Sequence, residues 1–198
     1  LLPRATKGDA LFEIDSNGAE SDTPRTRLRV SNFVAIQPQT SADNEANDLA
    51  AGLFRGNSDT TLVNGLIIAP NNECIRMNGS GTTPATLTAR SVALQCNATK
   101  YLGSGSYNAS AVQTAFGSGA NNNNDSFTNT LASLFINGAN ETGVTAFNAS
   151  TLASFFDVTS WIGAVRNSSD TWYAGWTCNS ATANFGSSSS SCTSLPVT

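Results

Sequence analysis

The sequence predicts an all-β fold with minor α, in which residues 1–100 form the coils of a parallel β-helix and residues 101–198 form a capping region. Three observations indicate this class: short β-prone segments that repeat in the first half, a neutral composition rich in turn-forming residues, and helical spacing after Lys100. A single coil of such a solenoid cannot bury its own apolar face, and stacked coils bury it together.

Two sets of similar segments recur in the first half. In the first set, two apolar residues precede a charged one, and Asp or Asn closes the segment; the second set is a longer, largely apolar run. The first set comprises residues 11–15, 53–57 and 74–78, and the second comprises residues 30–36, 62–68 and 88–94. Stacked coils would place Asp15, Asn57 and Asn78 at one turn, where amides can hydrogen-bond along the axis. An antiparallel sandwich with coincidental similarity is the alternative.

The composition indicates a surface built from neutral polar groups. Charged residues make up 12% of the chain, about half the roughly 25% of globular domains, and the net charge is −4. The basic cluster of Arg25, Arg27 and Arg29 has the period of a strand, which is typical of a solvated strand face. Because no concentrated basic surface and no apolar run of roughly 18 residues is present, we expect neither nucleic-acid binding nor a membrane span.

Four cysteines fall into two local pairs, Cys74 with Cys96 and Cys178 with Cys192. The sequence has no Cys-x-x-Cys motif and no histidine, so a zinc site is not expected. Two disulfides with these pairings are favoured among three possible connectivities, and four free thiols in a cytosolic protein are the alternative. Disulfides form in oxidising compartments, so we expect a protein of the extracellular space or outer cell surface.

The second half is expected to be partly helical. Residues 110–116 and 127–135 carry apolar side chains at helical spacing. Asp125 or Ser126 would cap the second of these helices, and residues 150–156 would form a further helical turn. Because an exposed solenoid end can template aggregation, this non-repeating half is predicted to cover the end of the coils.

Two segments near the end of the sequence resemble a known family. Residues 155–165 have the sequence Phe-Phe-Asp-Val-Thr-Ser-Trp-Ile-Gly-Ala-Val, and residues 172–177 have the sequence Trp-Tyr-Ala-Gly-Trp-Thr. Together they resemble the closing motif of a family of exported bacterial β-helix proteins, often lipoproteins or secreted proteins. Residues 8–25 and 52–56 also resemble segments of that family.

The resemblance implies a right-handed parallel β-helix at the outer surface or outside the cell. It implies no established activity and no catalytic residue. Members of the family are longer, with several more coils upstream. We therefore expect this chain to be a C-terminal fragment whose partners are the upstream part of the same precursor or identical subunits.

Acidic residues are the remaining candidates for chemistry, since the absence of histidine excludes Ser-His-Asp and Cys-His sites. Asp43, Glu45 and Asp48 lie close together among other oxygen-bearing side chains, the ligand type that Ca²⁺ takes, although the EF-hand layout is missing. Surface solubility is the alternative role for these acids, and no cofactor other than Ca²⁺ is expected. Glycoside cleavage would need two converging acids, with candidates in the same segment and at Glu13, Asp15, Glu20 and Asp22.

The aromatic residues Trp161, Trp172, Tyr173 and Trp176 include every tryptophan of the chain and are the candidate binding residues. Exposed rings could stack on the sugars of a surface glycan or anchor a protein partner. The alternative, which the flanking apolar Ile162 favours, is that these rings seal the apolar end of the solenoid.

The leading functional interpretation is a non-catalytic exported or cell-surface protein with a structural or adhesive role, including a fibre or assembly subunit. The alternative is a carbohydrate-active protein, either glycan-binding or a fragment of a glycan-cleaving enzyme. That alternative requires two acids, or an arginine and an acid, to converge in a groove. An ice- or mineral-binding solenoid ranks last, because threonine does not recur at one place in every coil. An enzyme is therefore not favoured.

Overall fold

The computed structural model describes the chain except for residues 1, 4–7, 17, 41–48, 80–82 and 195–198. Alternate strands of the first half enter two different four-stranded parallel sheets. The first sheet has the order β1-β3-β5-β7, formed by Leu2–Pro3, Thr26–Ile36, Ser58–Ala69 and Thr86–Cys96. The second sheet has the order β2-β4-β6-β8, formed by Phe12–Ile14, Gly52–Phe54, Ile75–Gly79 and Tyr101–Gly105.

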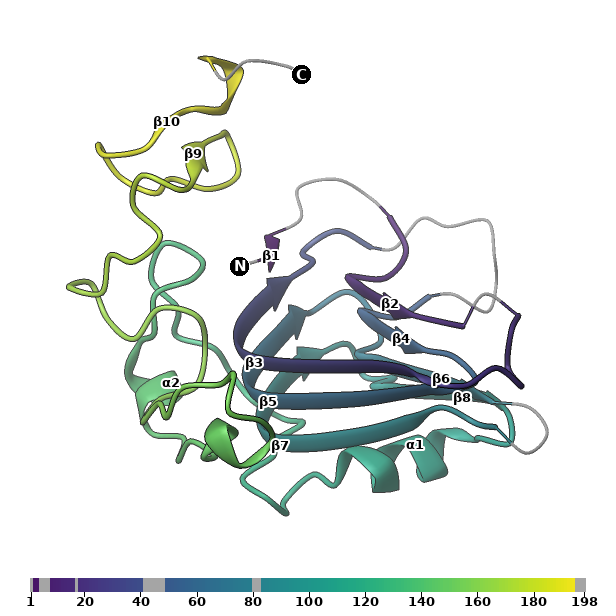
Figure 1. Cartoon of the computed structure of the whole chain (residues 1–198). Coiled ribbons are helices and arrows are strands. Elements are labelled where there is room, and N and C mark those ends of the chain that lie inside the picture. The colour runs from purple at the N-terminus through teal and green to yellow at the C-terminus, as the bar shows by residue number, and fades with distance from the viewer. Residues whose placement is uncertain (1, 4–7, 17, 41–48, 80–82, 195–198) are drawn as a thin grey trace.

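The second half of the chain has less regular structure. Its helices are α1, α2 and the 3-10 turns η1 and η2, formed by Ala109–Phe116, Ala139–Thr142, Ala149–Thr151 and Cys192–Ser194. A third, two-stranded parallel sheet joins β9, Cys178–Asn179, to β10, Ser190–Ser191. Figure 1 shows β3, β5 and β7 side by side with α1 beyond β7, while the irregular segment that carries α2 runs past one end of these strands.

The predicted right-handed β-helix with a helical cap is wrong, whereas the broad class of all-β with minor α is confirmed. The strands lie in three separate parallel sheets rather than in one stack of equivalent coils. The two repeat sets are physically unequal. The strands β3, β5 and β7 have 11, 12 and 11 residues, whereas the strands of the second sheet have only three to five.

The long strands are buried on both faces over their second halves, which explains their continuous apolar runs. On one face, alternate residues such as Phe33, Ile67 and Leu94 join the core between the two four-stranded sheets. On the other face, Leu66 and Ile68 join a second cluster, which we call the outer cluster. The C-terminal half contributes to this cluster the buried residues Phe127, Phe135, Ile162, Ala164, Val165 and Tyr173.

The segments predicted to stack are paired in a partly different register. Val30 pairs with Leu62 as the repeat predicts, but Leu62 then pairs with Ala89, one residue beyond the predicted Thr88. The predicted stack of Asp15, Asn57 and Asn78 is wrong. The Ser104 hydroxyl donates to Asn78 Oδ1 at 2.7 Å. The Asn57 amide donates instead to the carbonyls of two loop residues, Ala19 and Asp22.

A row of left-handed backbone positions crosses the three long strands. Asn32, Asn64 and Ser91 each have a φ of 54°, and they lie opposite one another because the residues on either side of them are paired. Asparagine tolerates this conformation better than most residues with a side chain. Each strand therefore changes, at the same level, which of its residues face the core.

The helix predicted at residues 110–116 is confirmed as α1. The Ala111 backbone N–H donates to the Asn108 side chain at 2.9 Å, which caps the helix, and Val112 and Phe116 are buried in the core between the sheets. The helix predicted at residues 127–135 is wrong.

That segment is irregular because Phe127 and Phe135 pack into the outer cluster rather than along one helical face. Asp125 and Ser126 therefore cap no helix there. Of the turn predicted at residues 150–156, only the start is helical, as η1.

Both predicted cysteine pairs are joined. The Cα atoms of Cys74 and Cys96 lie 5.6 Å apart, and those of Cys178 and Cys192 lie 4.8 Å apart. Cys74 directly precedes β6 and Cys96 ends β7, so the first disulfide links the two four-stranded sheets. The second disulfide closes the loop that contains β9 and β10.

Candidate functional site

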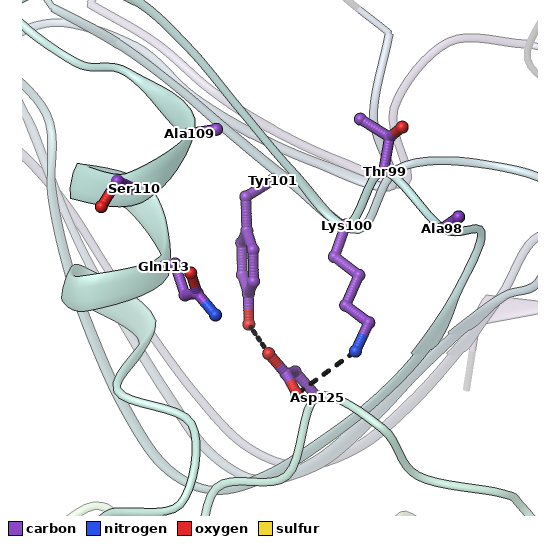
Figure 2. Close-up of a pocket in the computed structure, with 8 residues that line it drawn as sticks. All are labelled: Ala98, Thr99, Lys100, Tyr101, Ala109, Ser110, Gln113 and Asp125. Carbon is purple, nitrogen blue, oxygen red and sulfur yellow. Dashed lines mark hydrogen bonds and ion pairs between the residues drawn. The ribbon is translucent and has the colours of Figure 1, made fainter.

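A polar hollow of about 560 Å³ lies between α1 and the start of β8 (Figure 2). Three segments line it: residues 98–101, one face of α1 and Asp125. Because Val112 and Phe116 occupy the buried face of α1, Ser110 and Gln113 are left to line the hollow.

The backbone around the hollow brings Asp125 onto the start of β8. Gly117 ends α1 in a left-handed conformation with a φ of 70°. The chain then returns along the edge of β7, where the Asn124 N–H donates to the Val92 carbonyl at 3.0 Å and the Leu94 N–H donates to the Asn124 carbonyl at 2.8 Å. This edge pairing fixes the position of the next residue, Asp125.

Asp125 is the centre of the hydrogen bonding in this hollow. The Tyr101 hydroxyl donates to Asp125 Oδ2 at 2.8 Å, and Lys100 Nζ lies 3.4 Å from Asp125 Oδ1. Lys100 Nζ also donates to Ser126 Oγ at 2.8 Å. Figure 2 shows the Tyr101 and Lys100 side chains converging on the carboxylate from the same side.

The surroundings shift the pKa values of Asp125 and Tyr101 in opposite directions. Burial alone raises the pKa of the Asp125 carboxyl, but the hydroxyls of Tyr101 and Ser118 and the Lys100 ammonium outweigh it, so the pKa is below its usual range. Burial, and then the Asp125 carboxylate, raises the pKa of Tyr101 far above its usual value. At neutral pH the carboxylate is ionised and the phenol is protonated, so this pair suits hydrogen bonding rather than proton transfer.

We expect Asp125→Asn to lower the free energy of unfolding by about 1–2 kcal/mol at neutral pH, because hydrogen bonds to charged groups contribute about 1.5–3 kcal/mol. The folded-state pKa of Asp125 is lower than the unfolded value, so its stabilisation is present above the ordinary value of 3.8 and is lost as the pH falls through the folded-state pKa. Urea unfolding at about pH 7 and about pH 2.5 measures the difference. A loss equal at both pH values would contradict the prediction, and Asp157→Asn, at an exposed position, is the control.

A smaller hollow of about 290 Å³ adjoins the first and shares Ala98, Lys100 and Asp125 with it. Gln95 and Phe127 line the side farther from α1. The two hollows therefore form one polar groove that passes over the ion pair of Lys100 and Asp125.

Three of the predicted acids gather around Arg55. Its Nη1 lies 4.0 Å from Glu13 Oε1 and its Nε lies 3.7 Å from Asp15 Oδ2, with all three side chains partly exposed. Glu20 lies directly over Gly56, where an added Cβ would be 2.6 Å from Glu20 Oε1. Glu20 and Arg55 also line a common hollow of about 310 Å³. The sequence predicted these acids but not that Arg55 would join them. Ion pairs this exposed contribute about 0–1 kcal/mol each to stability.

The predicted calcium ligands Asp43, Glu45 and Asp48 lie outside the described residues. Within the described ranges, no group of three or more acidic or cysteine side chains is arranged to hold a metal ion.

The predicted aromatic residues differ widely in exposure. Tyr173 is buried in the outer cluster, and Trp161 is half-buried with the Arg166 guanidinium 5.2 Å from its ring centre. Trp172 and Trp176 are 57% and 89% exposed. Within this group, Tyr173 is therefore part of the buried cluster, and only Trp172 and Trp176 are largely exposed.

Sequence analysis did not identify Lys100, Tyr101 and Asp125 as a site. The Tyr101 and Asp125 contact spans 24 residues of sequence, and no local pattern predicts it. The only available signal was a lysine and a tyrosine at the start of a strand.

Comparison with protein-family models, curated proteins and solved structures finds no match to this chain. In the parts of the chain that the structure describes, no helix has the length and apolar character needed to cross a bilayer.

Proposed function

We propose that the protein is a non-catalytic structural or adhesive protein of the extracellular space or outer cell surface, and that it assembles with identical subunits through the open edge of β3. Three features support this proposal: two disulfides, the hydrogen-bonded pair of the Asp125 carboxylate and the Tyr101 phenol, and the difference between the two edges of the first sheet. The assembly part of the proposal rests on the difference between the β3 edge and the β7 edge of this sheet.

The outer edge of β7 is covered. The Ser91 N–H donates to the Asn121 carbonyl at 2.9 Å, the Phe127 N–H donates to the Leu94 carbonyl at 3.1 Å, and α1 packs alongside. On the opposite edge, β1 pairs only with Ala35 and with the residue after it. Among the described residues, no strand pairs with the preceding part of β3 on that side. Unpaired N–H and C=O groups of an edge strand favour the addition of another strand.

The geometry favours a closed pair of subunits over a fibre. A fibre needs two complementary ends, whereas among the described residues the β7 edge is covered and the β3 edge is paired only at Ala35 and Ile36. Two copies that join their β3 edges form an isologous interface, which closes on itself.

We expect Arg27→Pro to keep the protein monomeric. The Thr26 N–H donates toward β5, to the Asn57 carbonyl at 3.1 Å, so strand alternation directs the Arg27 N–H to the open edge. Proline removes that donor and is tolerated on edge strands. Arg27→Ala is the control, because it loses the same 3.8 Å ion pair with Asp59 but keeps the N–H.

Light scattering over a range of concentrations measures the assembly. Wild type and Arg27→Ala should dimerise with increasing concentration, and Arg27→Pro should weaken dimerisation at least about tenfold. Wild-type protein that stays monomeric at every concentration would contradict assembly through this edge.

Glycan recognition is the second candidate function. An arginine and several acids do converge, but Glu13 and Asp15 are both paired with the same Arg55 guanidinium at partly exposed positions. Such a cluster suits polar recognition, because its carboxylates and guanidinium are hydrogen-bonding groups at partly exposed positions. Binding, rather than cleavage, is therefore the carbohydrate role that we propose.

A further inference from the structure

A pocket of about 270 Å³ opens over the outer cluster, between residues 133–136 and residues 184–186. Its wall is aromatic. The rings of Phe135 and Phe185 stack with centres 4.8 Å apart and an interplanar angle of 30°. Tyr173 stands edge-on to Phe135, at 5.0 Å and 79°. The volume is just below the range of pockets that hold drug-sized ligands, so the pocket suits a ligand about as large as one sugar ring.

Polar groups without partners surround this aromatic wall. Within the described residues, the hydroxyls of Ser133 and Tyr173 and the amide nitrogen of Asn184 make no hydrogen bond, while Asn184 Oδ1 accepts the Gly186 N–H at 2.8 Å. No lining residue carries a charge. Phe135 and Tyr173 are buried, so the partly exposed ring of Phe185 is the aromatic surface that a ligand would contact. This ring with neutral hydrogen-bonding groups around it matches a pyranose, which has an apolar face and hydroxyls around its edge.

Both walls of the pocket are held in shape. On one wall, Asn179 donates to the Gly186 carbonyl at 2.9 Å and accepts the Phe185 N–H at 2.6 Å, inside the loop that the second disulfide closes. On the other wall, Ser133 and Leu134 have φ values of 51° and 73°. A leucine in this conformation is strained and persists only where its surroundings fix it. A pocket that is fixed in advance loses less entropy when it binds a ligand.

We propose that this pocket binds one residue of a neutral saccharide. Trp172 extends the site. Its ring centre lies 6.2 Å from that of Tyr173, its indole N–H is held by the Ala164 carbonyl at 2.9 Å, and the ring is 57% exposed. A second sugar unit can stack on it. This inference goes beyond the glycan recognition proposed at Arg55, because the pocket is a separate site with no charged lining residue, and it does not depend on assembly through β3.

The test uses the wild-type chain with its disulfides intact and the neutral disaccharides cellobiose, chitobiose, lactose and maltose, with sialyllactose as the charged comparison. Saturation-transfer NMR detects binding, and intrinsic fluorescence gives the affinity. Tyr173→Phe and Asn184→Ala each remove one rim group while keeping the aromatic wall. Trp176→Phe is the control, because Trp176 is 89% exposed and does not line the pocket. Circular dichroism verifies that every variant is folded.

We expect at least one neutral disaccharide to bind, and its affinity to fall about 5- to 10-fold in each rim variant but not in Trp176→Phe. Failure of all four neutral disaccharides to bind would overturn the proposal. The proposal would also be overturned if neither rim variant changed the affinity, or if Trp176→Phe lowered the affinity as much as the rim variants do. Tighter binding of sialyllactose than of any neutral disaccharide would overturn it as well. These outcomes are independent of light scattering, so a monomeric chain that binds a sugar would contradict only the assembly.

Discussion

Replacing Asn64 with alanine is expected to lower the free energy of unfolding by about 3–4 kcal/mol. Asn64 is fully buried, and its amide donates to the Phe147 carbonyl at 2.9 Å while its Oδ1 accepts the Phe147 N–H at 2.7 Å. Its own carbonyl accepts the Gly163 N–H at 2.9 Å. Alanine would leave both backbone groups of Phe147 without this partner and would also have to adopt a φ of 54°.

Two further variants at this position separate the cost of the lost side-chain hydrogen bonds from the cost of the positive φ. Asn64→Gly loses the same hydrogen bonds but accepts the positive φ, so it should be about 1 kcal/mol more stable than Asn64→Ala. Asn64→Asp keeps an acceptor for the Phe147 N–H, but it replaces the donor with an oxygen that faces the Phe147 carbonyl and buries a carboxyl group, so it should be at least as destabilising as Asn64→Ala. Urea unfolding gives the three free energies, and hydrogen exchange at Phe147 reports the local loosening. An alanine variant within about 1 kcal/mol of wild type would refute this account.

The repeat segments predicted the presence of the strands better than their arrangement. A run such as residues 62–68 is apolar at nearly every position, which fits a buried strand but does not state which partners cover each face. Here the second face of β3, β5 and β7 is covered by an irregular half that lacks periodicity of its own. The predicted stack of equivalent coils failed because the sequence spacing does not reveal that the two repeat sets build strands of unequal length.

The cysteine pairs could be predicted because each pair is local in sequence. The polar site at Asp125 could not, because it depends on where a loop returns after α1. The acids around Arg55 were identifiable by type, but their convergence depends on the register of β2 and β4, in which Ile14 pairs with Phe54. The row of left-handed positions at Asn32, Asn64 and Ser91 could not be predicted for another reason. A polar residue inside an apolar run suggests a break in the strand, and only the strand register shows that the three positions are aligned.

Gly65, the residue after Asn64, should also be sensitive to substitution, but for a steric reason. The register pairs Gly65 with Phe33, and a Cβ at Gly65 would overlap the Phe33 ring. Phe33 is 5% exposed and packs edge-on against Phe12, with ring centres 5.5 Å apart, so its ring has little room to move. We expect Gly65→Ala to lower the free energy of unfolding by about 2–3 kcal/mol, as overpacking in a closed core does.

A double-mutant cycle distinguishes this clash from a general loss of backbone freedom. Phe33→Leu removes most of the ring that the new methyl group meets, so Gly65→Ala should cost at least about 1 kcal/mol less in that background than in wild type. Gly143→Ala is the control, because an added Cβ there would meet only ordinary contacts at 3.4 Å and φ is −75°. If the two backgrounds give the same cost, the effect of alanine does not come from Phe33. The close approach of β3 and β5 at this level would then need another explanation.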